Sequence, residues 1–152
     1  MKTQSIRAWG WRALLILALT MTVGVAACTV RLISSYDPVT DQEVTALQKQ
    51  VDQLLVKLDH DPTPAYSTVA NSYESIWVDF KVLYVRNEAR PKNQITTQQL
   101  DQLRGELQDL ETANKKEVLN QAMLKPAGES IQQTFRAILQ LELAKKETGS
   151  EH

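Results

Sequence analysis

The sequence predicts an all-α protein, an antiparallel up-and-down bundle of about four helices that follows an apolar N-terminal segment. Two observations lead to this fold class. Large apolar residues recur at alternating spacings of three and four, the period of a helix with one buried face. Short breaks, most of them containing proline, separate four such stretches, so consecutive helices are expected to pack antiparallel. A long coiled-coil hairpin, or a dimer of such hairpins, would use the same apolar stripes.

The N-terminal segment, residues 1–27, has the layout of an export signal. It carries Lys2, Arg7 and Arg12 and no acidic residue. An uncharged run of fifteen residues, Ala13–Ala27, follows these charges. A helix that spans a membrane needs about 20 apolar residues. The run therefore has the length of a cleavable signal's hydrophobic region, which ends in small residues.

The end of this run resembles the lipobox of bacterial lipoproteins. An aliphatic residue and two small ones, Val25, Ala26 and Ala27, precede Cys28. The resemblance implies that the sulfur of Cys28 receives a diacylglyceryl group. It also implies that the signal is cut before Cys28 and that the new amine is acylated, for example with palmitate. Two or three acyl chains together hold a protein on a membrane for long times. Thr29 stands where an aspartate would resemble an inner-membrane retention signal, which favours the outer membrane.

An ordinary signal peptide with a chance cysteine and an uncleaved anchor remain alternatives. The lipoprotein interpretation divides the chain into a cleaved signal peptide (1–27), a lipidated tether (28–40), a helical bundle domain (41–147) and a disordered tail (148–152). Cys28 is the only cysteine, so the chain forms no internal disulfide and its stability must come from packing.

The charge of the chain argues against nucleic-acid binding. The chain has 17 basic and 18 acidic residues, and three of the basic ones lie in residues 1–27. The remainder therefore carries 14 basic and 18 acidic residues, a net charge near −4. Binding to phosphate needs a basic face, so we expect no nucleic-acid partner.

The first two helices have clear stripes. Thr40 and Glu43 read as a capping box that starts a helix near residue 41, which ends at the prolines of residues 60–64. A second helix is expected over about 65–89. Within it, residues 76–85 also alternate as a strand would. We favour helix because the three-and-four stripe begins ten residues earlier.

The third and fourth helices are less sharply bounded. Thr96 and Gln99 offer a second capping box, and the stripe that follows fades towards a turn expected at Pro126–Gly128. The last helix is expected over about 129–146.

Two polar residues interrupt the apolar stripes. Asn114 is interpreted either as a buried amide that sets helix register or as part of a fraying helix end. Glu142 is interpreted either as a buried carboxylate, which would need a partner such as Arg86 or Lys81, or as a glutamate at a loose helix end.

Two sets of residues are candidate binding sites. Val78, Val82 and Val85 gather with Ala89 on the side of the second helix opposite its aromatic stripe. Our hypothesis is that this row binds a protein partner; alternatively, another helix or the tether covers it. Four aromatic residues could instead line a small-ligand pocket between helices, although such residues are more often plain core. They are Tyr73, Trp77, Tyr84 and Phe135.

No motif for catalysis or cofactor binding is present. The only histidines are His60 and His152, and no HExxH, CxxC, GxSxG or phosphate-binding glycine loop occurs. His60 and Met123 are the only conceivable haem ligands, and both look incidental. We therefore expect no metal, no cofactor and no enzymatic activity.

Several stretches after Cys28 resemble a group of small proteobacterial lipoproteins. These stretches are residues 34–37, 44–49, 89–93 and 135–146. The resemblance carries no functional residue to this chain. Together these observations predict a lipid-anchored helical protein of the cell envelope that faces the periplasm and acts as a structural or adaptor protein. A helical bundle that binds a small ligand is the alternative.

Overall fold

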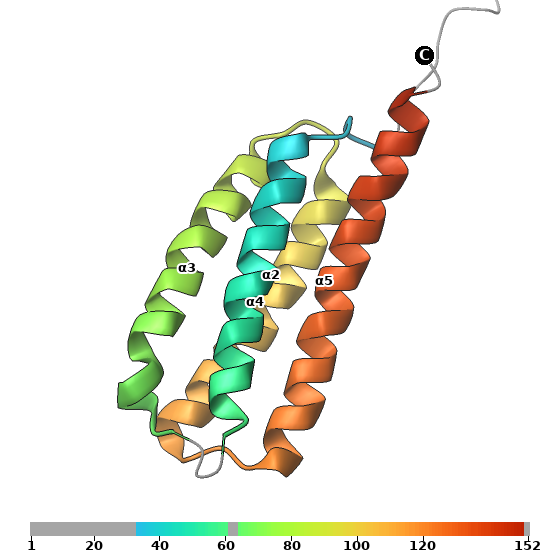
Figure 1. The fold of residues 1–152 in the computed structure, drawn as a ribbon. Coiled ribbons are helices and arrows are strands. Elements are labelled where there is room, and N and C mark those ends of the chain that lie inside the picture. The colour runs from blue at the N-terminus through green and yellow to red at the C-terminus, as the bar shows by residue number, and fades with distance from the viewer. Residues whose placement is uncertain (1–32, 61–63, 151–152) are drawn as a thin grey trace, which may run out of the picture. The chain divides into compact units, whose positions relative to one another are not determined.

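Four helices pack side by side in the computed structural model, which describes residues 33–60 and 64–150 (Figure 1). Leu32–His152 form one compact unit. The helices are α2 (Pro38–Leu58), α3 (Tyr66–Glu88), α4 (Gln94–Lys116) and α5 (Gln121–Ser150). Each helix contacts the one before and after it in the chain, and α2 also contacts α5, which closes a square. The prediction of an all-α up-and-down bundle of four helices is confirmed.

The core lies along the axis between the four helices. It uses the residues spaced by three and four that predicted the helices, because only one stripe of each helix can face the other three. Residues 76–85 are helical, with Ile76, Phe80 and Leu83 buried. The buried apolar side chains are Val44, Leu47, Val51, Leu54, Leu58, Val69, Tyr73, Ile76, Phe80, Leu83, Leu100, Leu103, Leu107, Leu110, Leu119, Leu124, Ile131, Phe135 and Ile138.

The expected start of the first helix is wrong by three residues. Asp37, not Thr40, is the N-cap of α2: its carboxylate accepts the N–H of Val39 at 3.3 Å, and Pro38 opens the helix. Proline suits the first helical position because the N–H that it lacks would have no partner there. The hydroxyl of Thr40 instead donates to Asp37 at 2.9 Å, inside the bundle.

The capping box expected at Thr96 is also absent. The helix α4 begins at Gln94 after Asn93, so Thr96 lies within its first turn and is fully buried. Its hydroxyl bonds to side chains of α5 and not to the backbone of its own helix. The capping box does not form because Glu142 and Lys145 of α5 bond to the hydroxyl of Thr96.

The last helix is longer than expected at both ends. Asn120 starts it, since its side chain accepts the N–H of Met123 at 3.1 Å and its carbonyl accepts that of Leu124 at 2.9 Å. Pro126 then lies inside α5, at a cost of about 3 kcal/mol for an interior position. Burial of Leu119 and Leu124 against the core offsets this cost. At the other end α5 continues to Ser150, through the first residues of the expected disordered tail.

The boundary expected between tether and bundle also moves. Ser34 is buried, and its N–H donates to the carbonyl of Lys92 in the α3–α4 connection at 2.9 Å. Lys92 has a left-handed backbone (φ 61°). The chain therefore joins the bundle at Ser34, six residues after Cys28 and well before residue 41.

Candidate functional site

A buried cluster of polar side chains occupies the end of the bundle where the chain enters it. The start of α2, the α3–α4 connection and the C-terminal part of α5 lie at this end (Figure 1). At its centre the side-chain oxygen of Asn93 accepts the hydroxyl of Ser34 at 2.7 Å and the ammonium of Lys145 at 2.9 Å. One buried amide thus ties the segment before α2 to the last helix.

Lys145 and Glu142 form an ion pair inside this cluster. Their side chains are 3% and 1% exposed, and the ammonium lies 2.6 Å from the carboxylate. The hydroxyl of Thr96 accepts from Lys145 at 2.8 Å and lies 3.2 Å from Glu142. A buried ion pair is tolerated only when further hydrogen bonds satisfy both charges, as they do here.

These contacts decide between the two interpretations of Glu142. It is buried and not at a loose helix end, and its partner is Lys145, one turn further along α5, and neither Arg86 nor Lys81. Asn114 is likewise buried within α4 and not at a frayed end. Its side-chain amide has no hydrogen-bond partner in the described structure.

A second layer of charge covers the cluster. Asp37 contacts Arg90 at 2.8 Å and Arg86 at 3.1 Å. Burial alone would raise the pKa of the Asp37 carboxyl, but hydrogen bonds from Thr40 and Arg86 and the charge of Arg90 outweigh it and lower the pKa. Arg90, in the α3–α4 connection, also donates to the carbonyl of Ser35 at 2.7 Å, so this connection holds the segment before α2 as well.

We call this set of contacts the tether clamp: Ser34, Asp37, Arg86, Arg90, Asn93, Thr96, Glu142 and Lys145. It joins the segment before α2 to the other three helices. Its contacts are hydrogen bonds and ion pairs that connect these parts of the fold.

The three valines that predict a partner surface lie exposed on α3. Val78, Val82 and Val85 are 63%, 56% and 55% exposed, while the opposite side of the same helix is buried. Among the described residues, no other helix covers this row. The row therefore meets the first requirement of a binding surface, an apolar stripe in contact with solvent.

The four aromatic residues proposed to line a pocket do not share one. Tyr73 and Phe135 are fully buried, while Trp77 and Tyr84 pack on the edge of the core. Burial also raises the pKa of the Tyr73 hydroxyl, which has no hydrogen-bond partner in the described structure. These side chains fill space between α3 and its neighbours.

Trp77 also takes part in a polar contact at the α3–α4 boundary. Glu111 accepts the indole N–H of Trp77 at 2.7 Å and the hydroxyl of Tyr66 at 2.9 Å, and it pairs with Lys115 at 2.8 Å. Burial would raise the pKa of Glu111, but these three donors together lower it. The contact holds α3 against α4 in the half of the bundle away from the tether clamp.

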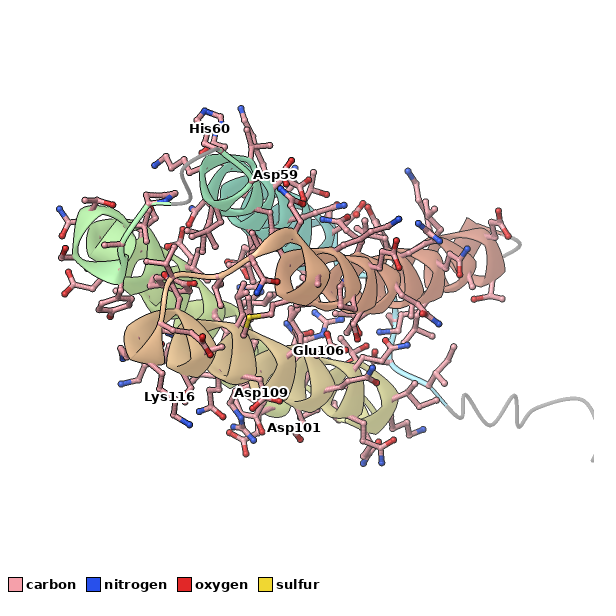
Figure 2. The ribbon with its side chains drawn as sticks, turned by 90° about the horizontal axis from the view of Figure 1, so that it is seen from below. Asp59, His60, Asp101, Glu106, Asp109 and Lys116 are labelled. Atoms are coloured by element: carbon pink, nitrogen blue, oxygen red, sulfur yellow. The ribbon has the colours of Figure 1, made fainter. Side chains whose placement is uncertain are left out.

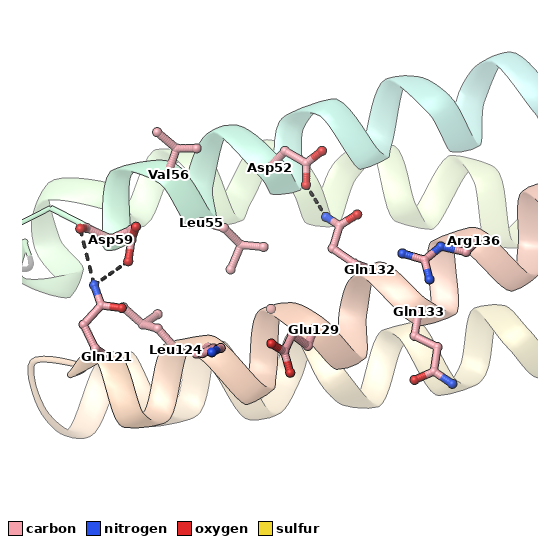
Figure 3. A pocket seen from close by; sticks show the side chains of 12 residues that line it. Asp52, Leu55, Val56, Asp59, Gln121, Leu124, Glu129, Gln132, Gln133 and Arg136 are labelled. Atoms are coloured by element: carbon pink, nitrogen blue, oxygen red, sulfur yellow. Dashed lines mark hydrogen bonds between the residues drawn. The ribbon is translucent and has the colours of Figure 1, made fainter.

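A groove between α2 and α5 forms a pocket (Figure 3). It encloses about 950 Å³. Leu55 and Leu124 give it an apolar floor, and charged side chains of both signs surround them. Hydrogen bonds cross it from Gln132 to Asp52 and from Gln121 to Asp59. The sequence pattern did not reveal this groove, because it depends on how far apart two helices lie.

The outer surface of the bundle is charged and carries no metal site among the described residues. Figure 2 shows Asp101, Asp109 and Lys116 pointing away from α4, and His60 at the end of α2. No group of three or more histidine, cysteine or acidic side chains could hold a metal ion there. None of the described helices is long and apolar enough to cross a membrane. Cys28 and the lipobox residues Val25, Ala26 and Ala27 lie outside the described residues.

No family model, curated protein or solved structure matches this chain. The described residues define the class of the fold, a four-helix bundle of up-and-down topology.

Sequence analysis did not identify Lys145, Ser34 and Asn93 of the tether clamp, because the sequence pattern around them indicates their contacts weakly or not at all. Lys145 follows Ile138 and Glu142 on the buried arc of α5 at spacings of four and three, which hinted at an ion pair on the inward face. Ser34 and Asn93 had no such signal, because their contact joins residues 59 positions apart.

Proposed function

We propose that this chain is a lipid-anchored helical protein of the cell envelope, facing the periplasm, that acts as a structural or adaptor protein without catalysis. The observation that carries the proposal is the tether clamp. Ser34 lies six residues after Cys28, and an extended chain covers at most about 3.5 Å per residue. A lipid on Cys28 would therefore hold the bundle within about 20 Å of the membrane.

The tether clamp would limit how freely the bundle turns relative to a lipid anchor on Cys28. A flexible tether of forty residues would let a bundle turn freely, whereas buried contacts hold Ser34 and Asp37 to the bundle. The bundle would then present its sides to neighbouring proteins from a nearly constant height. Holding a surface close to a membrane raises its effective concentration for partners on that membrane.

The test is intact mass and membrane fractionation of the wild type beside Cys28→Ser. We expect the wild type to begin at an acylated Cys28 and to sediment with the outer membrane, and the variant to lose its lipid. An unlipidated, periplasmic wild type, or one that keeps residues 1–27, would overturn the anchor. Sedimentation with the inner membrane would leave the lipid anchor in place and overturn only the expectation of the outer membrane.

The groove between α2 and α5 favours a second candidate function, the binding of a small amphiphilic ligand. Its apolar floor and charged rim match the usual composition of a ligand site. Gly128 lies on this floor, where an added Cβ would sit 3.6 Å from Leu55. Gly128→Trp would therefore fill the groove, and Gly128→Ala would leave it open as a matched control. A ligand that raises the melting temperature of the Ala variant but not of the Trp variant would support this function.

A further inference from the structure

The exposed row on α3 has the spacing of a coiled-coil seam. Val78, Val82, Val85 and Ala89 follow one another at intervals of four, three and four, and all four are exposed. Such a repeat turns one continuous stripe towards a second helix. We call these four residues the α3 seam. It lies opposite the stripe that α3 buries in its own bundle.

Charged residues flank the α3 seam on both sides. Asp79 and Arg86 lie on the side towards α2. Gln50 of α2 donates to Asp79, and Arg86 pairs with Asp37, the N-cap of α2. Both also remain exposed.

The other flank has the opposite order of charge. Lys81 and Glu88, both exposed, lie one turn beyond Trp77 and Tyr84, whose side chains contact α4. Each flank thus carries one acid and one base, seven residues apart. Along the chain the acid comes first on the α2 side and the base comes first on the α4 side.

These flanks reject a parallel pairing of two copies of α3. In a parallel coiled coil, a residue on one flank meets the residue five positions later on the other flank of the partner helix. That rule brings Lys81 next to Arg86 of the second copy. It also brings Glu74 next to Asp79. Like charges meet at each of these positions and would repel.

Antiparallel pairing has two registers that keep the valines in contact. If Val82 lies opposite Val78 of the second copy, Lys81 meets Lys81 and Asp79 meets Asp79. This register also places like charges together.

The other antiparallel register places an opposite charge beside each of Asp79, Lys81, Arg86 and Glu88, the charges that flank the α3 seam between Val78 and Ala89. Val82 then lies opposite Val85 of the second copy, and Val78 opposite Ala89. Because equivalent flanks face each other in an antiparallel pair, Lys81 comes to lie two residues along the axis from Glu88 of the second copy. That offset is about 3 Å, within the reach of both side chains.

The flank towards α2 behaves in the same way. Asp79 comes to lie two residues along the axis from Arg86 of the second copy. Arg86 already pairs with Asp37, but a guanidinium has five N–H donors and can serve two carboxylates. The two-fold symmetry repeats each contact, so four pairs of opposite charge surround four apolar layers.

We infer that the α3 seam binds the α3 seam of a second copy of this chain, antiparallel, with Val82 opposite Val85. This inference deepens the proposed function by naming the partner of the exposed row, and it rests on that row being an interaction surface. The two-fold axis keeps the α2 side of both copies on one face of the dimer. Asp37, which pairs with Arg86 on that side, therefore lies on the same face of the dimer in both copies.

The test uses sedimentation equilibrium of Leu32–His152, which forms one compact unit. We expect a reversible dimer that weakens as salt rises. Val82→Asp, an exposed position, should make the chain monomeric, and its melting temperature should match that of the wild type at concentrations where the wild type is monomeric too. Lys81→Glu turns two attractive pairs into repulsive ones, and the dissociation constant should rise roughly tenfold. Combining it with Glu88→Lys should restore the dimer.

Cysteine cross-linking tests the register directly, since Cys28 lies outside Leu32–His152 and leaves no native thiol. A mixture of Lys81→Cys and Glu88→Cys chains should form a short-linker cross-link more readily than either variant alone. Cross-linking of Lys81→Cys with itself would point to the repulsive register and overturn the inference. A chain that stays monomeric at high concentration and low salt would overturn it as well, leaving the row to a different partner. Because these samples carry no lipid, either result is independent of the fractionation of Cys28→Ser.

Discussion

Removing Lys145 alone should destabilise the bundle strongly. Its ammonium is 3% exposed and donates to Glu142, Thr96 and Asn93 at 2.6, 2.8 and 2.9 Å. In Lys145→Met the carboxylate of Glu142 stays buried with no opposite charge beside it. Breaking a buried pair in this way costs about 3–5 kcal/mol, which is a large share of the stability of a small domain.

The matched control removes both charges. In the double variant Glu142→Leu with Lys145→Met, no charge is left in the cluster, and Asn93 still accepts the hydroxyl of Ser34. Replacing a buried pair by apolar side chains is often neutral or stabilising. The double variant should therefore recover most of the free energy of unfolding that the single variant loses.

Urea denaturation followed by circular dichroism at 222 nm measures both variants on Leu32–His152. The signal reports the helices, and equal slopes for all variants allow their midpoints to be compared directly. A loss below about 1 kcal/mol in Lys145→Met would refute the reasoning, since an exposed pair contributes about that much. A double variant as unstable as the single one would mean that lost packing, and not an unpaired charge, causes the damage.

Four further outcomes are expected. The pKa of Asp37 is lower in the folded state than in the unfolded chain, where it is near 4. The stability that its ionised form contributes is therefore present above that unfolded pKa and is lost as the pH falls through the folded value. In Asp37→Asn, the free energy of unfolding should depend less steeply on pH in this acidic range. Gly128→Ala, in ordinary contact with its neighbour and inside α5, should raise the free energy of unfolding by about 0.5–1 kcal/mol in thermal or urea melts, and a loss would show that the floor of the groove is tighter than described. Tyr73→Phe should be neutral or stabilising by up to about 1 kcal/mol, because the buried hydroxyl has no partner; a loss above that would reveal a hidden hydrogen bond. Leu103→Ala, at a fully buried position, should cost about 2–5 kcal/mol, whereas the exposed Val82→Ala should stay within about 0.5 kcal/mol in the same assay.

The tether clamp and the α3 seam belong to neighbouring parts of the same end of the bundle. Arg86 takes part in both, as the residue that pairs with Asp37 inside one copy and faces Asp79 of the other in the proposed dimer. Disrupting the clamp could therefore weaken the dimer by freeing or displacing this side chain. Comparing the dissociation constants of Asp37→Asn and of the wild type would measure that link.

Local signals misplaced the helix starts. Thr40 and Thr96 have the residue types of capping boxes, yet both lie inside a first turn. Thr40 bonds to the nearby Asp37 and to Asn87 of α3, and Thr96 bonds to Lys145 of α5. Pro126 indicated a turn, but the cap at Asn120 and the burial of Leu124 carry α5 through it. A capping residue contributes about 1 kcal/mol, so a tertiary contact of similar size is enough to move a helix boundary.

The helices and their inward faces followed from the sequence alone, since a period of 3.6 residues is a local property that each stretch displays by itself. The same period placed Val78, Val82 and Val85 on one side of the second helix, but only the structure decided that this row is exposed. The partner of Glu142, the burial of Lys145 and the docking of Ser34 on Asn93 required the tertiary structure. So did the groove between α2 and α5. These features depend on which helix ends meet and how far apart two helices lie, and packing across distances of tens of residues decides both.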